Sequence, residues 1–162
     1  MNLFITSKSP AKSAKYLSQD RLRLNKQILE CSQMLANAII NSFENFPKNM
    51  QTKKRKEFYL PKKVNGDFYK KTHVNHPVSK WVMQNERNYR WTYLFFYELC
   101  EIYKKLRGKN HGCASDENDD KFFYGVYFLP DAKKKTPFIN CTPYKDLPVF
   151  KAYKKHLANK WK

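Results

Sequence analysis

The segment from residue 20 to residue 46 constrains the fold more than any other part of the chain. Its apolar residues recur at spacings of three and four, the period of one face of an α-helix: Leu24, Ile28, Cys31, Leu35 and Ala38. Asp20 is placed to cap this helix, and Pro47 cannot continue it. The sequence therefore predicts a long amphipathic helix that ends near Phe46, with the rest of the chain arranged around it.

The opposite side of this helix carries cations and side-chain amides around a single carboxylate. In chain order these residues are Arg23, Lys26, Gln27, Glu30, Gln33 and Asn37. A solvated face more often intersperses several acids and bases in i,i+4 pairs. Two interpretations are open: either the stripe lines an anion-binding pocket with Glu30 turned into it, or it is a surface face on which Glu30 pairs with Lys26.

The charge balance indicates a polyanionic partner. Lys and Arg number 32 against 14 Asp and Glu, a formal net charge of +18. Such a field attracts nucleic acid, because neutralised phosphates release counterions. We expect DNA or another nucleic acid as the partner, with a nucleotide-like anionic ligand as the alternative. The predicted phosphate-binding residues are Arg23, Lys26, Gln27, Gln33, His76, Lys80, Arg87 and the run Lys53, Lys54, Arg55 and Lys56.

The remaining elements are predicted from capping residues and composition. Ser9 and Pro10 start a short helix over 10–17, residues 75–77 start a second long helix that stops at Gly108, and Pro148 starts a last helix. Asn65-Gly66 predicts a small hairpin between 58–60 and 68–69, residues 121–129 are β-prone, and 115–120 is expected to be a solvated loop. The predicted fold is mainly α: one compact domain over 1–162, with two long helices, shorter helices and minor β-hairpin elements.

Several functional classes are disfavoured. No window is long and apolar enough for a membrane span, and the N-terminus lacks the pattern of a signal peptide. Four cysteines without paired spacing suit a reducing compartment, so we expect a cytoplasmic protein with no membrane partner. His73, His76, His111 and Cys113 lack the spacing of a zinc finger or ribbon, so neither a metal nor another cofactor is expected. A helix cap or a phosphate contact is the preferred role for His76.

Two blocks of residues together resemble a known family. The first block is Asp20, Arg23-Leu24, Lys26-Gln27, Glu30, Gln33 and Leu35, and the second is Asn75-His76-Pro77, Trp81, Asn88-Tyr89, Leu99-Cys100, Tyr103 and Gly108. They are similar to those of small phage and bacterial proteins of the endonuclease V-type pyrimidine-dimer DNA glycosylases. The opening Asn2-Leu3-Phe4 and the final Tyr, Lys and Trp-rich helix extend the likeness to the phage branch. A phage-encoded member would act in the host cytoplasm.

The resemblance implies a compact helical DNA-binding fold and a glycosylase/lyase reaction on damaged or modified bases. An amine attacks the sugar C1′, the base leaves, and a Schiff base leads to strand cleavage. Glu30 would be the helical glutamate of the family, with Arg23 and Lys26 as phosphate clamps. The family's nucleophile is the amine of a small second residue. Here the second residue is Asn2, which is bulky, so we expect Met1 to be kept.

The identity of the nucleophile is therefore open. It is the amine of Met1 itself, a lysine such as Lys26, or an activated water. A second hypothesis is a non-catalytic phage-type protein that uses the same basic pocket to bind nucleic acid or a nucleotide-like ligand.

Overall fold

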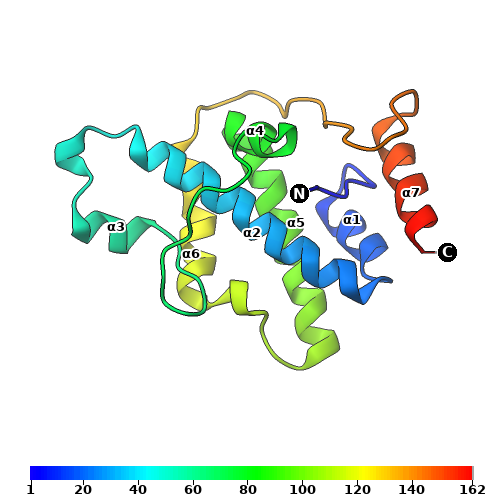
Figure 1. The fold of residues 1–162 in the computed structure, drawn as a ribbon, viewed down its shortest axis with the longest axis horizontal. Coiled ribbons are helices and arrows are strands. Elements are labelled where there is room, and N and C mark those ends of the chain that lie inside the picture. Colours follow the sequence, from blue (N-terminus) through cyan, green and yellow to red (C-terminus); the bar gives the residue numbers. More distant parts are fainter. Residues whose placement is uncertain (162) are drawn as a thin grey trace.

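The computed structural model describes residues 1–161, and it is mainly helical (Figure 1). Seven α-helices occur in this range: α1 (Pro10–Leu17), α2 (Arg21–Glu44), α3 (Lys53–Tyr59), α4 (Pro77–Gln84), α5 (Glu86–Arg107), α6 (Asp116–Tyr124) and α7 (Val149–Lys160). Three short 3-10 turns join them: η1 (Lys48–Met50), η2 (Gly112–Ala114) and η3 (Gly125–Phe128).

Helix α2 is the predicted amphipathic helix, and it runs through the middle of the molecule (Figure 1). Asp20 caps it as expected, since its carboxylate accepts a hydrogen bond from the Arg23 N–H. The predicted apolar stripe is buried, and α4 and α5 pack against it. The buried face is wider than predicted, because Gln27 and Asn37 also lie inside it.

The predicted second long helix is two helices, α4 and α5. Asn85 separates them in an extended conformation, with φ −160° and ψ 170°. Its side chain accepts a hydrogen bond from the Asn88 N–H and so caps α5, while the Asn88 amide donates to the Trp81 carbonyl at the end of α4. The break therefore comes from a buried pair of asparagines. His76 caps the start of α4 as predicted, and Gly108 ends α5 with φ 71°.

The expected β elements are not found among residues 1–161. Helix α6 replaces both the loop expected at 115–120 and the first part of the strand expected at 121–129. Ser115 caps this helix. The acidic side chains of Asp116, Glu117 and Asp119 in its first turn interact favourably with the positive end of the helix dipole. The predicted hairpin is also wrong: Phe58 and Tyr59 belong to α3, and only one isolated bridge joins Lys62 to Phe68.

The N-terminal segment lies beside α2 (Figure 1), and it packs against α7, the last helix. Leu3, Phe4 and Ile5 are buried in a non-helical segment, and the Phe4 ring contacts Tyr153 and His156 of α7. Helix α7 buries Tyr153 and Leu157, while its lysines point outward, as its sequence pattern predicts. No helix in the described range is long and apolar enough to cross a membrane.

Candidate functional site

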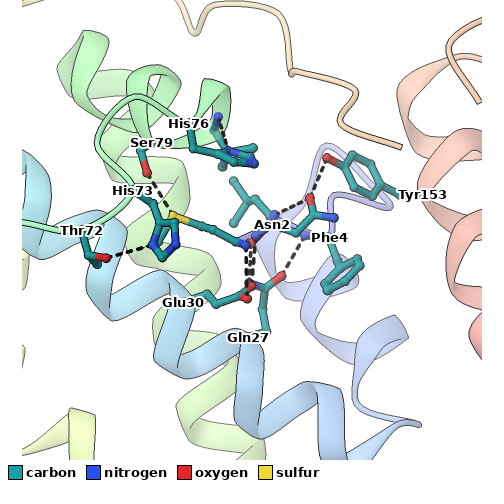
Figure 2. Close-up of polar contacts among 12 residues, drawn as sticks. Asn2, Phe4, Gln27, Glu30, Thr72, His73, His76, Ser79 and Tyr153 are labelled. Atoms are coloured by element: carbon teal, nitrogen blue, oxygen red, sulfur yellow. Dashed lines mark hydrogen bonds and ion pairs between the residues drawn. The ribbon is translucent and has the colours of Figure 1, made fainter. Parts of the chain in front are cut away.

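Glu30 lies against the N-terminus of the chain (Figure 2). Its Oε1 pairs with the α-ammonium of Met1 at 3.8 Å, and its Oε2 accepts a hydrogen bond from the Asn2 N–H at 3.1 Å. The Glu30 side chain is only 14% exposed, so it does not stand free in solvent. The single carboxylate of the polar stripe therefore faces the first two backbone nitrogens of the protein.

Gln27, one turn earlier on α2, fixes the path of the N-terminal segment. The side chain is fully buried, its Oε1 accepts from the Phe4 N–H at 2.8 Å, and its Nε2 donates to the Asn2 carbonyl at 2.9 Å. A buried amide with both ends hydrogen-bonded holds its partners firmly, since losing either bond leaves an unpaired polar group. Gln27 therefore fixes the position of Met1 and Asn2 relative to Glu30.

The side chains of Met1 and Asn2 are built into the surrounding structure. The Met1 side chain is 1% exposed, and its Sδ accepts from the Ser79 hydroxyl at 3.0 Å. The Asn2 Oδ1 accepts from the Leu3 N–H and from the Tyr153 hydroxyl (Figure 2). The N-terminal residues thus contact α4 on one side and α7 on the other.

A second buried amide of α2 positions the two histidines beside this site. Asn37 donates to the Thr72 carbonyl at 2.6 Å and accepts from the Thr72 N–H at 3.0 Å. The next residue, His73, has a left-handed backbone with φ 53°, and its carbonyl accepts from the His76 N–H. The loop carrying His73 and His76 is therefore anchored to the helix that carries Glu30 (Figure 2).

The electrostatics of His76 follow from this position. Partial burial lowers the pKa of its imidazole below the usual value, and the positive charges of the Met1 amine and of His73 lower the pKa further. Glu30 acts in the opposite direction. A neutral ring is also what the helix cap needs, because Nδ1 accepts from the Val78 N–H at 3.2 Å.

The structure brings only some of the predicted site residues together. Met1, Gln27, Glu30 and His76 meet at the N-terminus. Arg23 pairs instead with its own helix cap, Asp20, at 2.5 Å. Lys26 and Lys80 are exposed and Gln33 is half-buried.

The other predicted cations lie in separate places. The Arg87 guanidinium donates to the Ala132 carbonyl and pairs with Glu86 at 3.6 Å. Lys53, Lys54, Arg55 and Lys56 stand on the exposed helix α3, which Figure 1 shows at the far side of the molecule from the N-terminus.

The histidines and cysteines weighed for zinc do not converge. No group of three His, Cys, Asp or Glu side chains able to hold a metal ion occurs in residues 1–161. His111 lies at η2, where its Nδ1 accepts from the Cys113 N–H and its Nε2 contacts Asn25 Oδ1 at 2.7 Å. Burial raises the pKa of the Cys31 and Cys100 thiols, which keeps both protonated and poorly nucleophilic.

Sequence reasoning missed three residues that shape the site. Nothing in the sequence singles out Ser79, the spacing of Tyr153 predicts a core residue, and Asn2 enters only through the family resemblance and its size. Their contacts join Met1 to residue 79 and Asn2 to residue 153, so no local spacing predicts them. The stripe of Gln and Asn on α2 was the one visible signal, since amides on a buried face need partners.

Together these groups can perform proton transfer beside an amine. Glu30 can accept a proton from the Met1 ammonium and later return it to a leaving group, because it forms an ion pair with this amine and is held in place by the Asn2 N–H. An α-amino group ordinarily has a pKa more than two units below that of a lysine, so it is more readily a free nucleophile near neutral pH. The site therefore suits attack by an amine on an electrophilic carbon.

Comparison with models of known protein families gives a match over most of the chain. A model of the family described as pyrimidine dimer DNA glycosylase matches residues 1–117, which include α1 to α5 and every residue of the site except Tyr153. No curated protein and no solved structure gives a match.

Proposed function

This chain belongs to the pyrimidine dimer DNA glycosylase family, and from that premise we propose that it is a DNA glycosylase/AP lyase that uses its N-terminal amine as the nucleophile. The observation that carries the proposal is the position of the Glu30 carboxylate, 3.8 Å from the Met1 amine and 3.1 Å from the Asn2 nitrogen. The substrate class is DNA with a damaged or modified base, pyrimidine dimers first, or with an abasic site.

The reaction balances with the groups at the site. Glu30 takes a proton from the Met1 ammonium, and the free amine attacks C1′ of the damaged nucleotide. The bond from C1′ to the base breaks, and the base leaves with the electron pair and a proton. The sugar ring then opens to a Schiff base between C1′ and the amine. Glu30, free again after its proton has gone to the base, carries the second amine proton to the ring oxygen as the ring opens and then removes a C2′ proton. The C3′–O bond breaks, the 3′ phosphate leaves with the electron pair, and hydrolysis of the Schiff base by water returns the free amine.

Met1, rather than Asn2 or Lys26, is the residue we assign as the nucleophile. Its side chain is buried and bonded to Ser79, so it forms part of the fold. Lys26 is exposed on α2, whereas the Met1 amine pairs with Glu30. The Asn2 nitrogen also contacts Glu30, but in a chain that keeps Met1 it is a peptide nitrogen and cannot attack. The assignment treats Met1 as the first residue of the mature protein, which the intact mass measures directly.

DNA binding is assigned to the cations around this site and beyond it. Lys26 and Lys80 are exposed and free to reach phosphates, and the run 53–56 on α3 adds a further positive surface. In this proposal, His76 lies near the sugar of the damaged nucleotide. Gln27 is assigned a positioning role, because both of its amide ends already have backbone partners.

Borohydride trapping on a duplex with one abasic site tests the proposal. Borohydride delivers hydride to the Schiff base, so an active protein becomes covalently attached to the DNA. We expect an adduct with the native chain and none with a variant that carries Gly-Ser-Gly before Met1, which moves the amine away from Glu30. The same extension after Lys162 is the matched control. Tight binding by the native chain without adduct, base release or cleavage would contradict the proposal and support the non-catalytic binding protein.

A further inference from the structure

A basic cleft lies between α1 and α7, away from the contacts of Glu30. Its volume is about 460 Å³. Three lysines line it, Lys8, Lys12 and Lys154, together with the aromatic rings of Tyr16 and Phe150. The Lys154 ammonium sits 5.3 Å from the centre of the Tyr16 ring. Cations beside aromatic walls suit a ligand that combines negative charge with flat or apolar groups.

The loop that forms one wall of the cleft is held rigidly. The buried Ser13 hydroxyl oxygen accepts from the Thr6 N–H at 3.3 Å and from the Ser7 N–H at 3.0 Å, and it donates to the Ser7 carbonyl. The Trp91 indole donates to the Lys8 carbonyl at 2.8 Å. A ligand that binds here finds the backbone of Lys8 already in place, which lowers the entropy cost of binding.

Thr6 adds an independent indication of a ligand. It lines the cleft, it is only 3% exposed, and its hydroxyl has no hydrogen-bond partner in residues 1–161. Buried hydroxyl groups are nearly always paired, so an unpaired one calls for an explanation. A phosphate oxygen, an acceptor with a negative charge, would supply the missing partner.

The position of the cleft fits one DNA molecule that also reaches Glu30. Six residues separate Ser7 from Met1, and six extended residues span at most about 22 Å. One turn of B-DNA is about 34–36 Å long. The cleft is therefore less than a full helical turn from the Met1 amine. Two of its lining residues, Phe150 and Lys154, lie outside the segment that the family model matches.

We propose that the α1–α7 cleft binds the phosphodiester backbone of the DNA strand that enters the Glu30 site. Lys8, Lys12 and Lys154 neutralise one or two phosphates, Thr6 donates to a phosphate oxygen, and Tyr16 and Phe150 contact the sugar or base. The proposal rests on the proposed function for the identity of the ligand as DNA. The proposed phosphate site is built partly from residues of α7.

The test compares two triple variants with the same change in charge. One is Lys8→Gln with Lys12→Gln and Lys154→Gln, and the control is Lys104→Gln with Lys105→Gln and Lys109→Gln, three exposed lysines at the end of α5 and just after it. Affinity for an abasic duplex is measured from 50 to 300 mM salt. For every phosphate that the protein no longer neutralises, the slope of log K against log salt should become shallower by about 0.9.

We expect the cleft variant to lower the slope by about 1 to 2 and the affinity at 100 mM salt at least tenfold more than the control does. Equal changes in the two variants would overturn the proposal, because the effect would then belong to the overall charge. Thr6→Val should weaken binding a few-fold without lowering the melting temperature. Unchanged binding by Thr6→Val would overturn its assigned contact.

Two further readouts separate this proposal from others. Borohydride trapping by the native chain is read separately from the slopes. Absence of any adduct would contradict the proposed function and would leave the slope comparison valid. Anionic vesicles of phosphatidylserine offer the same phosphodiester chemistry on a membrane. If the cleft lysines governed binding to vesicles and not to DNA, the assignment to DNA would be overturned.

Discussion

The two ends of helix α2 have opposite surface chemistry. Near its start, Gln27 and Glu30 hold the N-terminal residues through buried or half-buried hydrogen bonds. Beyond its C-terminal end, a groove of about 650 Å³ lies between α3 and α6. Aromatic rings, three carboxylates and one lysine line it: Phe58, Tyr59, Tyr124, Tyr127 and Phe128 with Glu57, Glu117, Asp120 and Lys121.

The groove between α3 and α6 is exposed to solvent, whereas the Glu30 site is enclosed. Tyr127 is 74% exposed, and ring contacts run from Phe43 and Phe46 through Phe128 to Tyr59. Three carboxylates against one lysine disfavour a phosphate in this groove, although Glu117 pairs with that lysine and Glu57 with Lys62. The carboxylate near the start of α2 pairs instead with an amine. The difference teaches that net charge alone does not locate the chemistry: a carboxylate acts where buried partners fix it beside a nucleophile.

The strongest test of this comparison is to neutralise one carboxylate at each end of α2. Glu30→Gln should slow borohydride trapping at saturating DNA by at least about 100-fold, the usual size of a general acid–base contribution. Glu44→Gln is the matched control, because Glu44 lies on the same helix and, among residues 1–161, pairs only with Lys71 at the surface. Equal reductions in both variants, or retained trapping in Glu30→Gln, would break the assignment.

The next largest effect is expected for Gln27, the buried amide of α2 that bonds the N-terminal segment. Gln27→Ala should lower the free energy of unfolding by about 2–4 kcal/mol, since it leaves the Asn2 carbonyl and the Phe4 N–H unpaired and opens a cavity. Gln33→Ala, at a half-buried position, should cost less than about 0.5 kcal/mol. Urea denaturation measures both. A small decrease for Gln27→Ala would show that the N-terminal segment does not depend on it.

His76 gives a smaller, pH-dependent effect. Because its pKa is lowered in the folded state, the unfolded chain takes up this proton first as the pH falls through about 6.5. Stability should therefore fall between pH 7 and 5.5, by at most about 1.4 kcal/mol per pH unit from this group.

His76→Asn, which keeps a capping residue, should remove that part of the slope. His73→Asn should reduce it only slightly, because the charge of His73 is a smaller cause of the lowered pKa than burial is. His111 and His156 also have lowered pKa values, so a shallower dependence should remain in His76→Asn. Urea titrations at several pH values measure it. An unchanged slope in His76→Asn would contradict the assigned environment.

The smallest effect is expected at the aromatic end. Tyr127→Ala should change the affinity for an abasic duplex less than twofold, because the neighbouring carboxylates disfavour a phosphate backbone there. A base stacked on this ring would be worth about 1–3 kcal/mol. Fluorescence anisotropy measures this affinity. A fivefold or greater loss of affinity would show that DNA reaches this groove and would contradict the proposed difference between the two ends of α2.

Capping residues made much of the helical framework predictable. Ser9, Asp20 and His76 begin α1, α2 and α4 where the sequence predicted, and Gly108 ends α5. Local patterns failed where buried or capping side chains decided the structure. Asn85 interrupts the expected long helix, and Ser115 with the acids after it makes a helix where aromatic content suggested a strand.

For the site, the sequence singled out Glu30 but gave no distance to the N-terminus. The bonds of Gln27 to Asn2 and of Asn37 to Thr72 join segments far apart in the chain. The two amides were grouped with the cations as one polar stripe, whereas they are buried and hold backbone. A polar residue at helical spacing does not reveal whether it faces a ligand or a buried peptide group.

Peptide mapping of the borohydride-trapped adduct tests the central claim most directly. After digestion of protein and DNA, mass spectrometry locates the residue that carries the sugar remnant. The geometry at Glu30 predicts the remnant on the α-amine of Met1, in the peptide that begins the chain. A remnant on Lys26 or on any other lysine would contradict the account, because the nucleophile would then lie outside the contact between Glu30 and the N-terminus.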